Sequence, residues 1–396
     1  MSNYPKIILK SGKDQSLLRY HPWVFSGAIQ KSDYGIDDGD IVEVYNNKME
    51  FRGIGHYQIG SIAVRIISFK PVIPDLDFWI DKIDTALKIR TTLGLNNKEG
   101  KTNAFRLIHG EGDGLPGLII DYYNGTCVAQ MHSVGMYRSS KMIYDALKKV
   151  LGDQLKAIYE KSEGTLPFKA DIEPKNGFVF GKRADDYALE NGLKFKVDFE
   201  KGQKTGFFID QRENRTLLET YSNGRSVLNM FCYTGGFSFY AMRGGANLVH
   251  SVDSSERAVE ITKENVELNF PGDKRHEAFA VDAFKFLTDI KDKYDIIILD
   301  PPAFAKHQNV LSNALQGYRR LNAKAFEQIK KGGIVFTFSC SQVVTRDMFR
   351  KTIFSAAAIS GRNVRILNQL TQPADHPVNI YHPEGEYLKG LVLYVE

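Results

Sequence analysis

Two residues of this chain, an aspartate and a cysteine, have the types and placement that chemistry requires. Asp300 directly follows the apolar run 296–299 and precedes two prolines, and Cys340 follows the apolar run 334–338. Proline has no backbone N–H for a strand ladder, so the first strand must stop at the acid. Singly, such an Asp is often a cap and a free Cys a small buried hydrophobe. Together at neighbouring strand ends, they would pair a proton donor with a nucleophile.

Alternating strands and helices must position this pair. From about residue 225 onward, apolar runs recur with helical patterns between them. The expected strands are 227–231, 248–252, 278–281, 296–299, 334–338 and 391–395. This rhythm predicts a mostly parallel, doubly wound α/β sheet, which binds ligands at the carboxyl ends of its strands.

The first turn after a strand in this region, residues 231–236, carries two glycines but lacks the GxGxxG spacing of a pyrophosphate loop. Asp253 ends the next strand and could take both hydroxyls of a ribose as charge-assisted hydrogen bonds. Asp282 ends the third strand and could meet an adenine amino group. With Asp300, these acids at successive strand ends indicate S-adenosylmethionine rather than NAD.

The cysteine suggests what such a cofactor would methylate. Carbon 5 of a pyrimidine is too weakly nucleophilic to take a methyl group directly, but addition of a thiolate at carbon 6 makes it enamine-like. Cys340 suits that addition, and Asp300 suits protonation or hydrogen bonding at ring N3, because burial would raise its pKa. Cys232 lies in the turn 231–236, which we expect to contact the cofactor, and is interpreted as a packing residue. The sequence does not identify the base that removes the carbon 5 proton.

The chain divides into three expected domains. Residues 1–70 read as a small β-barrel, 71–190 as an α+β domain, and 191–396 as a hairpin followed by the α/β domain. The hairpin is expected between 193–199 and 207–209, with Asp210 as the N-cap of the next helix.

Two further segments have competing interpretations. Trp23 and Phe25 are expected in the barrel core, with a base-stacking surface as the alternative. Residues 105–117 form a glycine-rich stretch that lacks the GK[ST] ending of a P-loop, so we interpret it as a loop between strands.

Bulk properties narrow the function class. The 396 residues carry a net charge of +5, which is compatible with an RNA partner. The three cysteines are scattered without zinc spacing, so we expect no metal and a reducing compartment. No apolar run is long enough for a signal peptide or a bilayer span, so we expect a cytoplasmic protein without a membrane partner.

Several longer motifs are recognisable. In order, they are HPWVFSGAI, RLIHGEGDGLPGL, KTGFFIDQR, NMFCYTGGFS, SVDSSERAVEITKENVELN, DPPAF, TFSCS, ADHPV and HPEGEYLKG. The chain resembles the bacterial large-subunit ribosomal RNA cytosine-C5 methyltransferase I family over essentially its whole length. The resemblance implies an N-terminal PUA domain for RNA, a central α+β domain and a C-terminal Rossmann-like class I methyltransferase domain.

The resemblance also implies site residues, with Cys340 as the nucleophile beside Asp300. The residues expected to bind S-adenosylmethionine are Phe208, Asp210, Gln211, Arg212, Asn229, Phe231, Tyr233, Thr234, Gly235, Asp253, Ser254, Asp282, Ala283, Asp300 and Pro301. Those expected to contact the substrate are Pro302, Phe304 and Trp23. Two positions depart from the pattern: Asn229 stands where many methyltransferases carry an acid, and Ala303 where relatives often have Lys.

The leading hypothesis is therefore formation of 5-methylcytosine in large-subunit (23S) ribosomal RNA through a covalent Cys adduct, with the base flipped out of its stack. One alternative is methylation of an exocyclic amine of adenine or guanine, although Phe304 lies one place later than that chemistry favours. Another is a non-catalytic RNA-binding assembly protein, against which the intact acids argue. The target nucleotide, the RNA-binding surface and the oligomeric state, a homodimer included, stay open.

Overall fold

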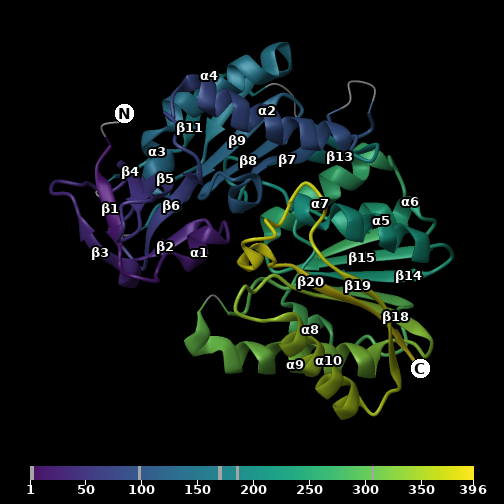
Figure 1. The fold of residues 1–396 in the computed structure, drawn as a ribbon. Coiled ribbons are helices and arrows are strands. Elements are labelled where there is room, and N and C mark those ends of the chain that lie inside the picture. The colour runs from purple at the N-terminus through teal and green to yellow at the C-terminus, as the bar shows by residue number, and fades with distance from the viewer. Residues whose placement is uncertain (1–3, 97–99, 168–171, 184–186, 306) are drawn as a thin grey trace. The chain divides into compact units, whose positions relative to one another are not determined.

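The computed structural model describes residues 4–96, 100–167, 172–183, 187–305 and 307–396. The chain divides into two compact units (Figure 1). The first comprises Met1–Gly192, Val197–Ile209 and Ala374–Gly385, and the second comprises Leu193–Lys196, Asp210–Pro373 and Glu386–Glu396. None of the helices in the described ranges is long and apolar enough to cross a lipid bilayer.

The first unit begins with a six-stranded sheet in the order β2-β6-β5-β4-β1-β3. Its strands are β1 Lys6–Leu9, β2 Trp23–Phe25, β3 Ile29–Ser32, β4 Ile41–Tyr45, β5 Phe51–Tyr57 and β6 Ile62–Ser68. Strands β1 and β4 pair in parallel, and the other pairs are antiparallel. The strands that the sequence predicts at 7–9, 41–45, 51–57 and 63–67 are present. The sequence did not reveal β2 and β3, because one is only three residues long and the other is mostly polar and exposed.

The prediction that Trp23 and Phe25 pack into the core is wrong. Alternation along β2 puts both on the face opposite the buried Val24. Phe25 is 48% exposed, and Trp23 is half-buried outside the core of this sheet. The indole N–H of Trp23 instead donates to Glu111 Oε1 at 2.9 Å, and its ring lies 4.4 Å from that of His382.

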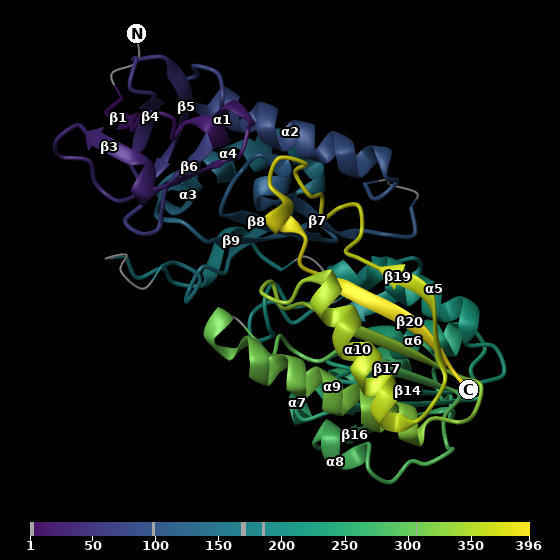
Figure 2. The ribbon, with the colours of Figure 1, turned by 60° about the horizontal axis from the view of Figure 1, so that its bottom comes forward.

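A five-stranded sheet follows in the first unit, in the order β11-β10-β9-β8-β7. Its strands are β7 Ala104–His109, β8 Leu118–Tyr123, β9 Thr126–Met131, β10 Ala157–Glu160 and β11 Gly177–Gly181. The unit's α-helices are α1 Gln15–Leu18, α2 Leu76–Thr92, α3 Val134–Arg138 and α4 Ser140–Leu151, of which α2 and α4 lie side by side over this sheet (Figures 1 and 2). The prediction of a loop over 105–117 is wrong for residues 105–109, which belong to β7.

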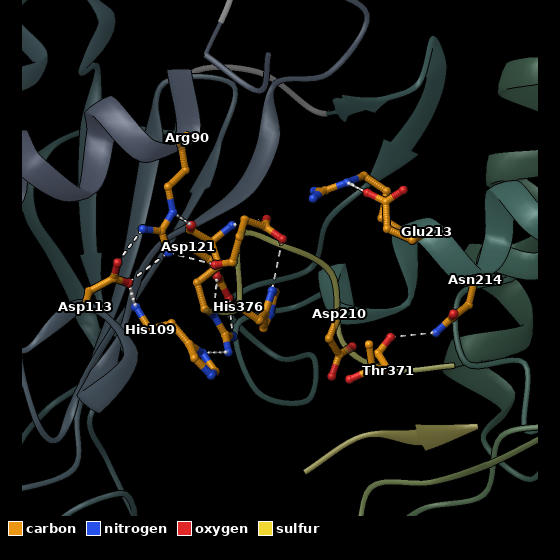
Figure 3. A network of polar contacts seen from close by, with 12 residues as sticks. Arg90, His109, Asp113, Asp121, Asp210, Glu213, Asn214, Thr371 and His376 are labelled. Carbon is orange, nitrogen blue, oxygen red and sulfur yellow. Dashed lines mark hydrogen bonds and ion pairs between the residues drawn. The ribbon is translucent and has the colours of Figure 1, made fainter. Parts of the chain in front are cut away.

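Buried polar contacts hold residues 374–385 in the first unit (Figure 3). Arg90 of α2 donates two hydrogen bonds to Asp113, at 2.5 and 2.8 Å, and a third to the carbonyl of Asp375 at 2.7 Å. The Asp375 carboxylate accepts from the backbone N–H of Arg106 at 3.0 Å. Because Arg90 is fully buried, loss of its carboxylate partner would leave an uncompensated charge.

A hairpin is present, but it is not the one expected between 193–199 and 207–209. Its strands are β12 Tyr187–Glu190 and β13 Leu193–Lys196, and residues 207–209 are not a strand. Asn191 and Gly192 connect the strands with φ of 49° and 84°, the left-handed pair of a two-residue hairpin turn. This Asn-Gly signal is readable in the sequence, whereas the prediction rested on the apolar residues at 207–209.

The second unit contains a seven-stranded sheet in the order β16-β15-β14-β17-β18-β20-β19. Its strands are β14 Ser226–Met230, β15 Leu248–Asp253, β16 His276–Ala280, β17 Ile296–Leu299, β18 Gly333–Ser339, β19 Val364–Leu370 and β20 Lys389–Val395. The first five are parallel, as predicted, whereas β20 runs antiparallel to both its neighbours. Strand β19 was not predicted, because it is a largely exposed edge strand of mixed polarity.

Helices cover both faces of this sheet (Figure 1). They are α5 Arg212–Tyr221, α6 Gly236–Arg243 and α7 Glu256–Asn269 on one face, and α8 Ala283–Phe286, α9 Leu311–Gln328 and α10 Arg346–Ser360 on the other. Successive connections run outward from β14 to β15 and β16, then return to β17 on its other side. The carboxyl ends of β14 and β17 therefore form the switch point at which such sheets bind ligands.

Candidate active site

The predicted acid and thiol follow neighbouring strands. Strands β17 and β18 pair in parallel, with Leu299 opposite Thr337. Asp300 comes directly after β17, and Cys340 comes directly after β18. The sequence-based placement of the two residues at one edge of the sheet is therefore confirmed.

The Asp300 carboxyl is set up to exchange a proton near neutral pH. Burial, with a smaller contribution from the nearby Asp210, raises its pKa to about 7. Gln211 Nε2 donates to its Oδ2 at 3.0 Å, and this bond and the charge of Arg215 oppose the rise. At pH 7 both protonation states are therefore populated, as a group that gives or takes a proton requires.

The Cys340 thiol is held in its neutral form. The residue is half-buried, and burial followed by the charges of Asp300 and Asp210 raises the pKa of the thiol to about 12. Lys389 opposes this rise. The resting site thus keeps its sulfur protonated, and the thiolate must form when the substrate is in place.

Lys389 is a site residue that the sequence analysis missed. It pairs with Ser339 in the β18–β20 ladder, and its Nζ donates to the carbonyls of Ser341 and Tyr387, both at 2.6 Å. These contacts place a buried ammonium beside the segment that carries Cys340. Its signal is a charged residue that begins the apolar strand 389–395, but its register with β18 could not be read from the sequence.

The segment after the two prolines contacts the residues that follow β18, the strand before Cys340. The ring of Phe304 lies 4.6 Å from that of Tyr318 in α9. The backbone N–H of Ala305 donates to Ser341 Oγ at 3.3 Å, and the Tyr318 hydroxyl lies 3.2 Å from the same oxygen. Tyr318 is a second residue missed from sequence, because only the packing of α9 brings it to this edge.

The turn after β14 has a strained backbone that Asp253 stabilises. Phe231 and Tyr233 have positive φ values of 58° and 49°, which non-glycine residues adopt at a cost. Asp253 Oδ2 accepts from the backbone N–H of Tyr233 at 2.9 Å, and Oδ1 accepts from that of Ser255 at 2.9 Å. Each carboxylate oxygen can accept a second bond, so the acid still has capacity for ligand hydroxyls.

Other predicted cofactor residues have contacts that differ from expectation. Asp210 is not the N-cap of α5, because it lies in the 3₁₀ turn Ile209–Gln211, and its Oδ2 accepts from the Tyr387 hydroxyl at 2.7 Å. Asp282 caps α8 by accepting from the backbone N–H of Lys285 at 2.8 Å. For Asp282, the structural role that competes with adenine recognition is therefore present.

The predicted residues differ in exposure. Those that are buried are Gln211, Arg212, Asn229, Thr234, Gly235, Ala283 and Pro301. Those that are half-buried are Trp23, Phe208, Asp210, Phe231, Tyr233, Asp253, Asp300, Phe304 and Cys340. Those that are exposed are Ser254, Asp282 and Pro302. Trp23 and Phe208 belong to the first unit, and all the others belong to the second.

Three buried polar atoms of this set fit a ligand rich in hydrogen-bond donors. Asp210 Oδ1, Asn229 Oδ1 and Thr234 Oγ1 have no hydrogen-bond partner within the described ranges. Buried polar atoms are normally paired, so three in one predicted site point to a ligand. The ammonium group and the ribose hydroxyls of S-adenosylmethionine supply the donors that the carboxylate oxygen of Asp210 and the amide oxygen of Asn229 need. The residues therefore fit the expected cofactor.

Two histidines and a glutamate of the first unit have the spacing of a metal site, but the hydrogen bonds of His21 do not suit a metal ligand. Ligand atoms of His21, His382 and Glu384 lie within 4.8 Å of one another. His21 Nδ1 accepts from the backbone N–H of Trp23 at 3.2 Å, which puts the proton of the neutral ring on Nε2. That nitrogen lies 3.5 Å from Glu384 Oε2, so it is placed as a donor rather than a metal ligand.

Comparisons with known proteins agree with this architecture. Residues 168–382 match the S-adenosylmethionine-dependent methyltransferase family, and residues 7–69 match the PUA-like domain. Ribosomal RNA large subunit methyltransferase I of Aeromonas hydrophila is 39% identical, over 98% of each chain, and its Escherichia coli counterpart is 37% identical, over 98% of this chain and 99% of the other.

Solved structures extend the likeness to the whole fold. A structure described as a candidate S-adenosylmethionine-dependent methyltransferase of Streptococcus mutans has a TM-score of 0.83 at 25% identity. A candidate methyltransferase in complex with SAH has a TM-score of 0.84 at 26% identity. Both alignments cover 98% of this chain and all of the other.

Proposed function

We propose, from the premise that this chain belongs to the ribosomal RNA large subunit methyltransferase I family, that it forms 5-methylcytosine in large-subunit ribosomal RNA. The observation that carries the C5 assignment is the placement of Cys340 and Asp300 at neighbouring strand ends. Methyl transfer to an exocyclic amine needs no thiol at this edge. The names of the relatives supply the ribosomal RNA, and this substrate implies action in the cytoplasm.

The cofactor is S-adenosylmethionine, which supplies an electrophilic methyl group on a sulfonium sulfur. The turn after β14 and the strand-end acids would hold it. Asp253 has accepting capacity for ribose hydroxyls, and Asp210 and Asn229 each offer an unpaired buried oxygen. Gly235 has φ of 87°, a conformation that glycine adopts readily because it has no side chain.

In the proposed mechanism, Cys340 activates the pyrimidine. Its sulfur forms a bond to carbon 6, and the π electrons of the C5–C6 double bond move towards carbon 5. Asp300 stabilises this adduct by donating a proton or hydrogen bond at N3, which its pKa of about 7 permits near neutral pH. After carbon 5 is methylated, a base takes its proton, the double bond re-forms and the bond from sulfur to carbon 6 breaks.

Formation of the thiolate is the costly event in this scheme. Proton transfer from Cys340 to the Asp300 carboxylate is uphill, because the pKa of the thiol is raised to about 12 and that of the carboxyl to about 7. The Lys389 ammonium works in the favourable direction, because it lowers the pKa of the thiol. The same proton, once on Asp300, is the one that N3 requires.

Mass spectrometry of nucleosides from methylated ribosomal RNA tests the proposal. The wild-type enzyme should produce 5-methylcytosine, and Cys340→Ala should produce none. Cys127→Ala is the matched control, because it removes a buried cysteine of the first unit. It should therefore retain activity in proportion to its folded fraction. A product methylated on an exocyclic amine, or full methylation by Cys340→Ala, would contradict the proposal.

A further inference from the structure

A pocket of about 240 Å³ lies in the second unit beside the strand end that carries the thiol. It is formed by the first turns of α10, the beginning of β20 and the end of β19. The lining residues are Arg346, Asp347, Phe349, Arg350, Gln369, Lys389, Gly390 and Leu391. Its volume is below the 300–1,000 Å³ typical of small-molecule sites, so it suits a compact group rather than a whole base or cofactor.

The lining of this pocket is positively charged. It contains three cations and one carboxylate, and that carboxylate, Asp347, is already paired with Lys351 at 2.7 Å. Arg346 is paired with Glu386 at 3.2 Å, outside the lining. Arg350 has no ion-pair partner in the described part of the chain.

The cations are also close enough to oppose one another. The pKa of Lys389 is lowered to about 8, mainly by burial; the charge of Arg346 also lowers it, whereas Cys340 and Glu386 raise it. The hydrogen bonds of Lys389 that the structure records go to carbonyl oxygens. An anion in the pocket would relieve this repulsion, and the amino end of the 15-residue helix α10 adds positive potential at the same place.

We infer that this pocket binds a phosphodiester group of the RNA strand next to the nucleotide that is methylated. Guanidinium groups bind phosphate oxygens through paired N–H donors, which matches Arg346 and Arg350. Lys389 ties the pocket to the thiol, because it pairs with Ser339 and donates to the carbonyl of Ser341, the two neighbours of Cys340. A strand whose base meets Cys340 would carry its backbone phosphate past these cations.

This inference rests on the proposed RNA substrate but not on the site of methylation. A free phosphate ion shares the chemistry of the group, and the position beside the thiol favours RNA as its source. The two sources can be separated, because only an RNA phosphate would change the affinity for RNA and its dependence on salt.

The test is RNA binding by fluorescence anisotropy at several salt concentrations, without cofactor, for wild type, Arg350→Ala and Arg365→Ala. Arg350 is exposed, so its substitution should leave the fold intact. Arg365 is the matched control, because it is an exposed arginine of the same unit that pairs with Glu396 near the opposite end of β19.

Arg350→Ala should weaken binding several-fold and reduce the slope of log K against log salt by roughly 0.7–0.9, the value for one phosphate contact. Arg365→Ala should leave the slope unchanged and should keep the kcat of the wild type. An unchanged slope for Arg350→Ala, or an equal loss in the control, would overturn the inference. So would thermal stabilisation by inorganic phosphate that Arg350→Ala abolishes without any effect on RNA binding.

This outcome is independent of the product. If Arg350→Ala reduces the slope but the product is not 5-methylcytosine, the pocket stands and the proposed chemistry fails. If the product is 5-methylcytosine and the slope is unchanged, the chemistry stands and the pocket inference fails.

Discussion

The thiol of Cys340 should react unusually slowly with alkylating reagents in the resting enzyme. A pKa of about 12 leaves about one thiol in 10⁴ as thiolate at pH 8. An ordinary cysteine, with a pKa of about 8.5, is roughly one-quarter thiolate at that pH. The thiolate is the reacting form, and a thiolate of higher pKa is a better nucleophile, which offsets part of this loss. Alkylation of Cys340 by iodoacetamide should therefore be on the order of 10²-fold slower than that of an exposed cysteine.

Substitution of Asp300 by Asn changes this rate in a direction that the structure predicts. The charge of Asp300 is the second cause of the raised thiol pKa, after burial. Its removal should lower the thiol pKa, so alkylation at pH 8 should accelerate several-fold while methyl transfer falls. The thiol should stay slower than an ordinary cysteine, because burial remains.

The assay is the rate of carbamidomethylation of the peptide containing Cys340, followed by mass spectrometry between pH 7 and 11. Cys340→Ser gives the background from Cys127 and Cys232, which are buried and whose pKa values are raised. An ordinary alkylation pKa in the wild type, or slower alkylation in Asp300→Asn, would refute the reasoning.

Two further predictions concern the scaffold. Asp113→Ala should reduce the free energy of unfolding measured in urea by about 3–5 kcal/mol, because it leaves the buried Arg90 without its carboxylate; a loss below about 1 kcal/mol would contradict this. Gly235→Ala should reduce cofactor affinity in calorimetry about tenfold or more, since its Cβ would lie 2.6 Å from Phe239 at a φ of 87°. Gly224→Ala, at a φ of 70° with nothing within 4 Å, is the control that introduces backbone strain alone and should bind the cofactor normally.

Continuous apolar strands and the residues that end them were readable from the sequence. The run 296–299 is fully buried, so only a central parallel strand suits it, and its end placed Asp300 correctly. The same reasoning placed Cys340 after β18.

What the sequence did not reveal depends on register and on distant packing. Lys389 reaches the thiol strand only because β20 returns antiparallel to β18, a pairing that no local pattern encodes. Tyr318 reaches it from the middle of α9. The expectation that Asp210 caps the following helix was wrong, because its side chain instead accepts from Tyr387, 177 residues later in the chain.

The most direct test of the central claim is to trap the covalent adduct. In RNA that carries 5-fluorocytosine, fluorine replaces the proton that must leave carbon 5, so the bond from Cys340 to carbon 6 should persist after methylation. Denaturing gel electrophoresis and intact mass should then show enzyme, RNA and one methyl group joined for the wild type, and no such species for Cys340→Ala. Efficient methylation of unmodified cytosine without an adduct on the fluorinated RNA would contradict the account.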